Sequence, residues 1–153
     1  MNRFPDLKTI ATISIGVLVG LSAFTFHYAE GLSYFSTDPR ACANCHIMRD
    51  QYDSWGRSSH HAAATCIECH LPHDLVPKYL AKARNGWNHS KAFTLQDFPE
   101  PIRITKWNAE ALHENCIRCH AGFVSHVAAA NRGGAMDMNC VQCHASVGHG
   151  SQR

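Results

Sequence analysis

The sequence predicts a mostly α-helical protein with much loop, made of one N-terminal transmembrane helix and a small domain that falls into two similar halves. Three observations support this fold class. An uncharged apolar run fills residues 9–26, a cysteine-containing pentapeptide recurs four times, and no alternating apolar pattern is long enough for a β-sheet. We expect short helices after the first one, and two domains, residues 1–29 and 30–153.

The N-terminal apolar run has the length of a membrane-spanning helix. Its 18 residues would extend about 27 Å, which approaches the roughly 30 Å hydrocarbon core of a bilayer. A cleaved signal peptide is the alternative, but the run is long for such a segment and no small-residue cleavage site follows it. Arg3 and Lys8 precede the run, and positive residues stay in the cytoplasm. The sequence therefore predicts a single-pass protein of the cytoplasmic (inner) membrane with its C-terminal domain in the periplasm.

Every cysteine of the chain belongs to a C-x-x-C-H pentapeptide. The eight cysteines form four pairs, each followed at once by a histidine: Cys42 and Cys45, Cys66 and Cys69, Cys116 and Cys119, and Cys140 and Cys143. This is the attachment signature of c-type haem, in which two thiols bond to the haem and the adjacent imidazole reaches the iron. Zinc sites and disulfides also use paired cysteines, but neither explains the histidines. The sequence therefore predicts four covalently bound haem c groups.

The spacing of the motifs predicts two di-haem halves. The first cysteines of motifs one and two are 24 residues apart, those of motifs three and four are also 24 apart, and the middle gap is 50. About 125 residues remain for four haems, which is too little chain for an ordinary hydrophobic core. We therefore expect the porphyrins to form the interior of the domain.

The charge balance changes once haem is counted. The polypeptide has a formal net charge of +2, and four haems would add up to eight propionate charges, which turns +2 into about −6. The lysines and arginines are therefore expected to pair with propionates. This excludes nucleic acid as the expected partner.

Two further helices are expected in the second domain. Asp74 can cap one, which would run to Gly86, before prolines at positions 99 and 101 break the chain. Thr105 can cap another that leads into the third motif. Its inward-facing residues are expected to be Trp107, Ala111 and Leu112. The Gly133–Gly134 pair and the tail from Gly148 are expected to form loops.

Candidate iron ligands come from two sets of histidines. The motif histidines supply one ligand to each haem: His46, His70, His120 and His144. Low-spin electron-transfer haems need a second strong ligand. His60 and His149 are the best candidates, because each lies beside one motif and can reach across to another haem. His61 remains the alternative to His60.

The first motif differs from the other three because Met48 follows its histidine by two residues. A thioether at this position can compete with His46 for the iron, and a Met ligand would raise the potential of that haem. Packing is the usual role of a methionine. This motif is also the one nearest to the anchor, which places the first haem near the membrane surface.

These motifs together resemble the NapC/NirT family of membrane-anchored tetrahaem quinol dehydrogenases. The resemblance covers nearly the whole chain and has four parts: C-x-x-C-H-x-M after a single N-terminal span, S-S-H before the second motif, C-H-L-P-H at its end, and C-V-x-C-H-x-x-V-G-H-G at the C-terminus. Within that family, the short length is most similar to the small, membrane-anchoring subunits of cytochrome c nitrite reductase.

The resemblance implies a function. The chain would oxidise menaquinol at the lipid bilayer and pass the electrons to the catalytic subunit of a periplasmic multihaem nitrite reductase that forms ammonia, within a hetero-oligomeric membrane complex. One alternative is a quinol dehydrogenase of the same family that feeds a different reductase. The others are a tethered electron carrier without a quinol site and a haem-based sensor.

The resemblance also implies roles for residues. Met48 rather than His46 would ligate the first haem, with menaquinol bound beside it. Lys82 matches the lysine of the family's quinol pocket, and Lys78 is the second choice. The family's acidic residue in this pocket is replaced by the Asn88–His89 stretch, so the proton acceptor would be His89 or Asp97.

The family's bis-histidine haems match the two distal candidates, His60 and His149, named above. The resemblance also allows the second haem to take its distal ligand from the partner subunit. In that case His70 would lack a partner within this chain.

Overall fold

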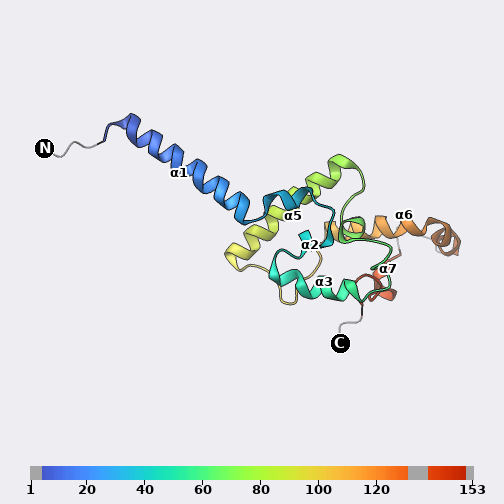
Figure 1. Cartoon of the computed structure of the whole chain (residues 1–153). Coiled ribbons are helices and arrows are strands. Elements are labelled where there is room, and N and C mark those ends of the chain that lie inside the picture. Colours follow the sequence, from blue (N-terminus) through green and yellow to red (C-terminus); the bar gives the residue numbers. More distant parts are fainter. Residues whose placement is uncertain (1–4, 131–137, 151–153) are drawn as a thin grey trace. The chain divides into compact units, whose positions relative to one another are not determined.

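The structure, a computed structural model, describes residues 5–130 and 138–150, and of His46 and residues 128–130 it describes only the backbone. The described residues are helical or irregular and contain no strand, so the predicted fold class is confirmed. The chain forms two compact units, residues 1–36 and 37–153 (Figure 1). The division into a membrane part, 1–29, and a periplasmic part, 30–153, stays a prediction.

The first unit contains α1, Leu7–Tyr28, and the 3-10 helix η1, Gly31–Phe35. Helix α1 extends two residues beyond the expected run at each end. It starts at Leu7 because the carboxylate of the preceding Asp6 accepts a hydrogen bond from the Thr9 backbone N–H at 3.2 Å. None of its residues is buried. Helix α1 is apolar and long enough to cross a bilayer, by length and composition, and it alone passes that test among the described residues.

The second unit begins with short helices around the first two motifs. They are α2, Pro39–Cys42; η2, His46–Met48; α3, Arg49–Gly56; and α4, Cys66–His70. Asp38 caps α2 by accepting from the Arg40 backbone N–H at 2.8 Å, with Pro39 at the first helical position. Helix α4 begins at a capping box, in which the Glu68 carboxylate accepts from the Thr65 backbone N–H at 2.6 Å.

Helix α5 spans Leu75–Leu95 and is longer than expected. It starts directly after Asp74, as predicted, but it runs nine residues past Gly86. A single interior glycine costs only about 1 kcal/mol relative to alanine, and the residues after it are tolerated in helices. The helix ends where Gln96 takes the left-handed conformation with φ 54°.

Helix α6, Lys106–Ala130, contains the third motif, and α7, Cys140–Cys143, opens the fourth. Thr105 caps α6 as predicted, because its hydroxyl oxygen accepts from the Asn108 backbone N–H at 3.4 Å. The expected inward residues are buried or half-buried: Trp107, Ala111 and Leu112. At 25 residues, α6 is not a short helix, because a second helical segment continues past a non-helical residue at His120. The Gly133–Gly134 pair lies outside the described residues.

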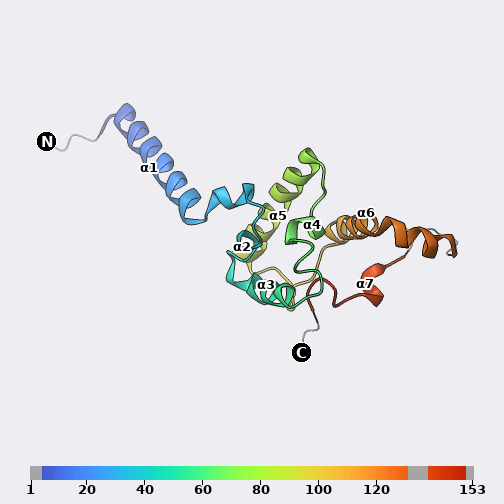
Figure 2. The same cartoon turned by 45° about the vertical axis from the view of Figure 1, so that its right-hand side comes forward.

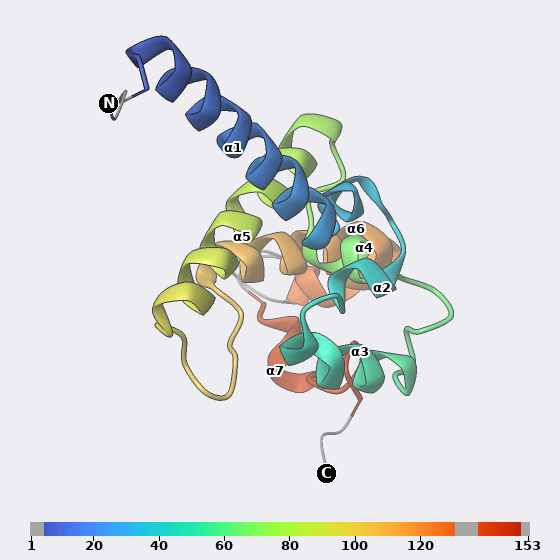
Figure 3. The ribbon, with the colours of Figure 1, turned by 60° about the vertical axis from the view of Figure 1, so that its left-hand side comes forward.

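The two halves of the sequence form one unit in space. Helix α4 of the first half packs against α6 of the second (Figure 2). The segment after α7 lies against α3, as Figure 3 shows. The apolar residues that the polypeptide buries are few and mostly small: Leu71, Ala81 and Ala111. Across residues 5–130 and 138–150 no large side chain is fully buried, so the polypeptide alone does not supply a normal core.

Candidate haem and quinol sites

The four motifs follow one another in space in the order of the chain. The Cys42 thiol shares a hydrogen bond with the Cys66 thiol, which lowers the pKa of Cys42 to about 7 and raises that of Cys66. Burial raises the pKa of Cys69, and the charge of Cys119 adds to this. The first interaction places motif one beside motif two, and the second places motif two beside motif three. Motif two is therefore a neighbour of motifs one and three.

The last step in this series joins motifs three and four. Burial makes the largest contribution to the raised pKa of the Cys116 thiol, and the charge of Cys140 makes the next largest. His113 also lies beside this last motif, with its Nδ1 atom 3.8 Å from the Cys140 sulfur. The arrangement brings consecutive attachment sites together, as electron transfer along a row of haems requires.

His60 and His120 face each other from different halves of the chain. Their ring centroids are 6.0 Å apart, with the planes inclined at 61°. His60 lies in the turns after α3, and His120 lies at the non-helical position within α6. The Ser59 hydroxyl oxygen lies 3.2 Å from His60 Nδ1. A partner on Nδ1 fixes the orientation of the ring and leaves Nε2 for a metal.

His70 and His149 form a second pair of this kind. Their ring centroids are 5.9 Å apart, with the planes inclined at 39°. His149 Nδ1 lies 3.1 Å from the Gln51 backbone carbonyl oxygen, so Nδ1–H donates and Nε2 is available. Burial, with a smaller contribution from His149, lowers the pKa of His70 to about 4. The ring is therefore neutral near pH 7, which is the form that binds a metal.

These two pairs have the spacing that a six-coordinate haem iron needs. With a metal–nitrogen bond of about 2 Å on each side, two axial imidazoles have centroids about 6 Å apart. Both measured distances, 6.0 and 5.9 Å, agree with this. The small polypeptide core supports the same conclusion, because large apolar side chains of the second unit remain uncovered: Leu75, Leu80, Trp87, Phe93, Phe123 and Val127. The residues present therefore fit haem.

The two neighbouring candidates, His60 and His61, have different surroundings. His61 is exposed and its ring stacks edge-on against Trp55, with centroids 5.1 Å apart. Trp55 is itself fixed, because its indole N–H donates to the Ala64 carbonyl oxygen at 3.0 Å. His61 is thus used in a packing contact, while His60 faces an imidazole.

The resemblance allowed a partner-supplied ligand at the second motif, and this stays a prediction. His70 faces His149 within the chain, with the ring centroids 5.9 Å apart. The sequence did not show this, because the pairing depends on where the C-terminal turn folds back onto α3.

The first motif has a different environment from the others. Its cysteines flank the end of α2, and Met48, which is half-buried, closes η2 directly before α3. The side chain of His46 lies outside the described atoms, so the choice between His46 and Met48 as the iron ligand stays a prediction.

Lys82 lies on α5 near the first motif. Burial lowers the pKa of its ammonium group, and the nearby Cys42 thiol acts in the opposite direction. The ammonium nitrogen also lies 5.6 Å from the centroid of the Tyr79 ring, over its face. His89 is seven residues further along, two helical turns and about 10 Å away on the same side of the helix. Lys82 and His89 can thus face one bound molecule.

Asp97 is not brought to Lys82. It follows the C-terminal end of α5, which is about 20 Å along the helix axis from Lys82. With Asn88, Lys91 and Leu95 among its neighbours, it lines a separate cavity of about 160 Å³. Of the two predicted proton acceptors, His89 is therefore the better placed.

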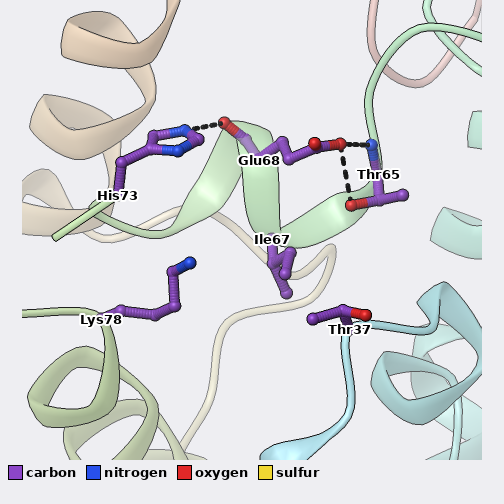
Figure 4. Close-up of a pocket in the computed structure, with 6 residues that line it drawn as sticks. All are labelled: Thr37, Thr65, Ile67, Glu68, His73 and Lys78. Carbon is purple, nitrogen blue, oxygen red and sulfur yellow. Dashed lines mark hydrogen bonds between the residues drawn. The ribbon is translucent and has the colours of Figure 1, made fainter. Parts of the chain in front are cut away.

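Lys78, the second choice of lysine, lines a different cavity of about 330 Å³ (Figure 4). The other lining residues are Thr37, Thr65, Ile67, Glu68 and His73. His73 is held there by Arg118, whose guanidinium nitrogen lies 2.5 Å from His73 Nε2. Neither Lys82 nor His89 lines this cavity.

Asn115 is a structural residue that the sequence did not reveal. It is buried on α6, one position before Cys116, and its side-chain amide donates to the carbonyl oxygens of Cys69 and Leu71 at 2.9 Å each. These carbonyls end α4 and would otherwise lack helical partners. The sequence shows only that a polar residue directly precedes the third motif, and this does not indicate which backbone groups it contacts.

Comparison with known proteins places the chain among c-type cytochromes. The NapC/NirT cytochrome c family, N-terminal region, matches residues 4–153. The cytochrome c-type protein NrfH of Wolinella succinogenes is 44% identical over 82% of this chain and 71% of that protein. The cytochrome c nitrite reductase subunit NrfH of Nitratidesulfovibrio vulgaris is 34% identical over 60% of this chain and 57% of that protein.

A solved structure is similar over nearly the whole chain. It is a crystal structure of the cytochrome c nitrite reductase NrfHA complex bound to the HQNO inhibitor, with a TM-score of 0.64 and 25% identity. The match covers 95% of this chain and 92% of that one. With the family match over almost every residue and the repeated haem-attachment motif, the chain belongs to the NapC/NirT cytochrome c family.

Proposed function

We propose that this protein is the membrane-anchored, quinol-oxidising subunit of a cytochrome c nitrite reductase complex that reduces nitrite to ammonia. The observation that carries the proposal is the 44% identity to NrfH of Wolinella succinogenes over most of the chain. The similarity to a chain of the NrfHA complex supports it independently. The catalytic nitrite reductase subunit is then the partner, and HQNO, the inhibitor in that complex, is an analogue of a quinol.

The chain holds four haem c groups in this proposal, one for each C-x-x-C-H motif. His60 and His120 ligate the third haem, and His70 and His149 ligate the second, because these are the imidazole pairs about 6 Å apart. Met48 ligates the first haem. When bound, the haem irons take up and release single electrons.

The quinol site lies along α5 beside the first motif. Menaquinol is the substrate, and its oxidation releases two electrons and two protons. Lys82 holds a positive charge next to one quinol oxygen and stabilises the anion that remains when its proton leaves. His89, on the same side of the helix and exposed to solvent, accepts that proton, and the second proton passes to water. Lowered solvent access at Lys82 strengthens this interaction, since the side chain is half-buried.

Helix α1 is the single-pass anchor in the cytoplasmic membrane, with the haem-bearing unit in the periplasm. Menaquinol stays dissolved in lipid, so the site that oxidises it must stand at the bilayer. The apolar length of α1 and the basic residues before it support this orientation.

Purification in mild detergent, followed by identification of the bound proteins, tests the proposal. We expect a multihaem nitrite reductase to copurify, and the complex to reduce nitrite with a menaquinol analogue as electron donor. Copurification of a nitrate or trimethylamine oxide reductase instead would replace the proposed partner. A complex that transfers electrons from dithionite but not from the quinol would show a tethered carrier.

A further inference from the structure

The two distal histidines are held by different kinds of hydrogen-bond partner. His149 Nδ1 lies 3.1 Å from the Gln51 backbone carbonyl oxygen, whereas His60 Nδ1 lies 3.2 Å from the hydroxyl oxygen of its neighbour Ser59. A carbonyl oxygen can only accept, so it fixes the proton on His149 Nδ1. A hydroxyl can donate or accept, so the direction of the Ser59 hydroxyl decides which form of the His60 ring is present.

A second contact of Ser59 settles this direction. Its hydroxyl donates to the backbone carbonyl oxygen of Val147 at 3.4 Å, across 88 residues of the chain. A hydroxyl has one proton. With that proton directed at the Val147 carbonyl, the Ser59 oxygen accepts from His60 Nδ1–H. His60 then has Nε2 free to bind iron, and the three groups form one continuous chain of hydrogen bonds.

The Val147 carbonyl has a defined position because the turn around it is packed against α3. Within the turn, the Gly150 backbone N–H donates to the Ser146 carbonyl oxygen at 2.8 Å. Gly150 has φ 60°, a left-handed conformation that favours glycine. A Cβ atom added there would lie 3.3 Å from the Ser54 carbonyl oxygen, so the turn approaches the backbone of α3 closely. The acceptor for the Ser59 proton is therefore held by the fold.

A hydrogen bond at Nδ1 changes the strength of an imidazole ligand as well as its orientation. Donation of the Nδ1 proton to an oxygen places more negative charge on the ring and makes Nε2 more basic. A more basic axial ligand stabilises oxidised iron relative to reduced iron, which lowers the reduction potential of the haem. The Met48 thioether proposed for the first haem acts in the opposite direction.

We infer that Ser59 is a positioning residue for the distal ligand of the third haem. Its hydroxyl holds His60 in the form with the proton on Nδ1, orients the ring towards His120 and keeps the potential of that haem low. The inference rests on the proposed role of His60 as an iron ligand, and it does not depend on the quinol or on the nitrite reductase.

Ser58 offers a matched control one residue away. Its hydroxyl oxygen is buried and has no hydrogen-bond partner within residues 5–130 and 138–150. Ser58→Ala and Ser59→Ala thus remove the same atom from neighbouring positions, but only the change at Ser59 removes a contact to a histidine. Ser59→Thr keeps a hydroxyl at the position and is the variant expected to behave like the wild type.

The test is a redox titration of the full-length, haem-loaded protein in detergent, followed by absorbance and electron paramagnetic resonance. Haem absorbance per polypeptide confirms that each variant is intact. His60→Ala identifies the third haem as the one whose low-spin signal disappears. In Ser59→Ala we expect the potential of this haem to rise and its g values to shift, because the ring loses its acceptor and its fixed orientation. Ser58→Ala and Ser59→Thr should match the wild type.

An unchanged potential of the third haem in Ser59→Ala would overturn the inference. An equal rise in Ser58→Ala would overturn it as well, because the effect would then belong to the segment and not to the hydrogen bond. A His60→Ala variant that keeps every low-spin signal would show that His60 is not a ligand, with the same consequence. The titration uses neither quinol nor nitrite, so a failure of quinol oxidation would count against the proposed function and leave this result unaffected.

Discussion

Two regions of the molecule expose large apolar side chains, and they do so for different reasons. Helix α1 is apolar around its whole circumference and buries nothing, which is the pattern of a helix solvated by lipid. The second unit leaves apolar residues uncovered on α5 and α6, yet it folds its polar groups and histidines into defined contacts. The difference indicates that the first region is suited to contact with lipid, whereas the second is suited to surround prosthetic groups.

Removal of one haem attachment site should have the largest effect, and it should affect the second unit but not α1. In the double variant Cys66→Ala with Cys69→Ala, we expect the second unit to lose its compact fold, because α4 is central to its packing. Helix α1 should still insert into the membrane, since it makes no use of haem. Limited proteolysis together with membrane fractionation measures both. A protease-resistant second unit without that haem would contradict the account of the core.

The imidazole pairs allow a sharper test within the second unit. His149→Ala should convert one low-spin haem to a high-spin form, because the iron opposite His70 loses its second nitrogen ligand. His61→Ala is the matched control and should leave all spin states unchanged, since His61 stacks on Trp55. Electron paramagnetic resonance counts the spin states. A change of spin state in the His61→Ala variant, with none in the His149→Ala variant, would contradict the assignment of His149 as an iron ligand.

Lys82→Ala tests the part of the second unit that is proposed to work at the lipid. We expect the rate of quinol oxidation to fall about 100-fold, as is typical when a preorganised charge is removed from an anionic intermediate. Haem content should not change. Lys91→Ala on the same helix is the control and should retain most of the activity, because Lys91 lines the separate cavity near Asp97. Equal rates in the wild type and the Lys82 variant would remove the residue from the site.

The smallest effect concerns a contact within the polypeptide itself, between α6 and α4. Asn115→Leu should destabilise the second unit by about 1–3 kcal/mol, because two carbonyl oxygens at the end of α4 lose their donor. Asn88→Ala, at an exposed position on α5, should change the stability by less than about 0.5 kcal/mol. Chemical denaturation monitored at the Soret band compares the two, and an unchanged midpoint for Asn115→Leu would count against its bridging role.

Local features of this fold could be predicted from the sequence. Asp74 and Thr105 mark the starts of α5 and α6, because helix caps depend on a few neighbouring residues. The end of α5 could not be placed, since Gly86 is a weak break in a helix that continues to Leu95. The apolar helix α1 could be predicted, because its length and composition can be read directly from the sequence.

The site could be predicted only in part. Residue types and spacing identify the haem attachment cysteines, but the pairing of His60 with His120 and of His70 with His149 depends on tertiary contacts. A shift of one residue exchanges His60 for His61, and the sequence carries no signal for the Trp55 contact that occupies His61. The separation of Asp97 from Lys82 likewise follows from the true length of α5.

The central claim is that haem groups, covalently attached at the four motifs, supply the interior that the polypeptide lacks. The intact mass of the chain purified from membranes tests it most directly. The account predicts the mass of the polypeptide plus four haem groups, with a Soret absorption to match. The mass of the bare polypeptide, in a protein that is nevertheless folded, would contradict it.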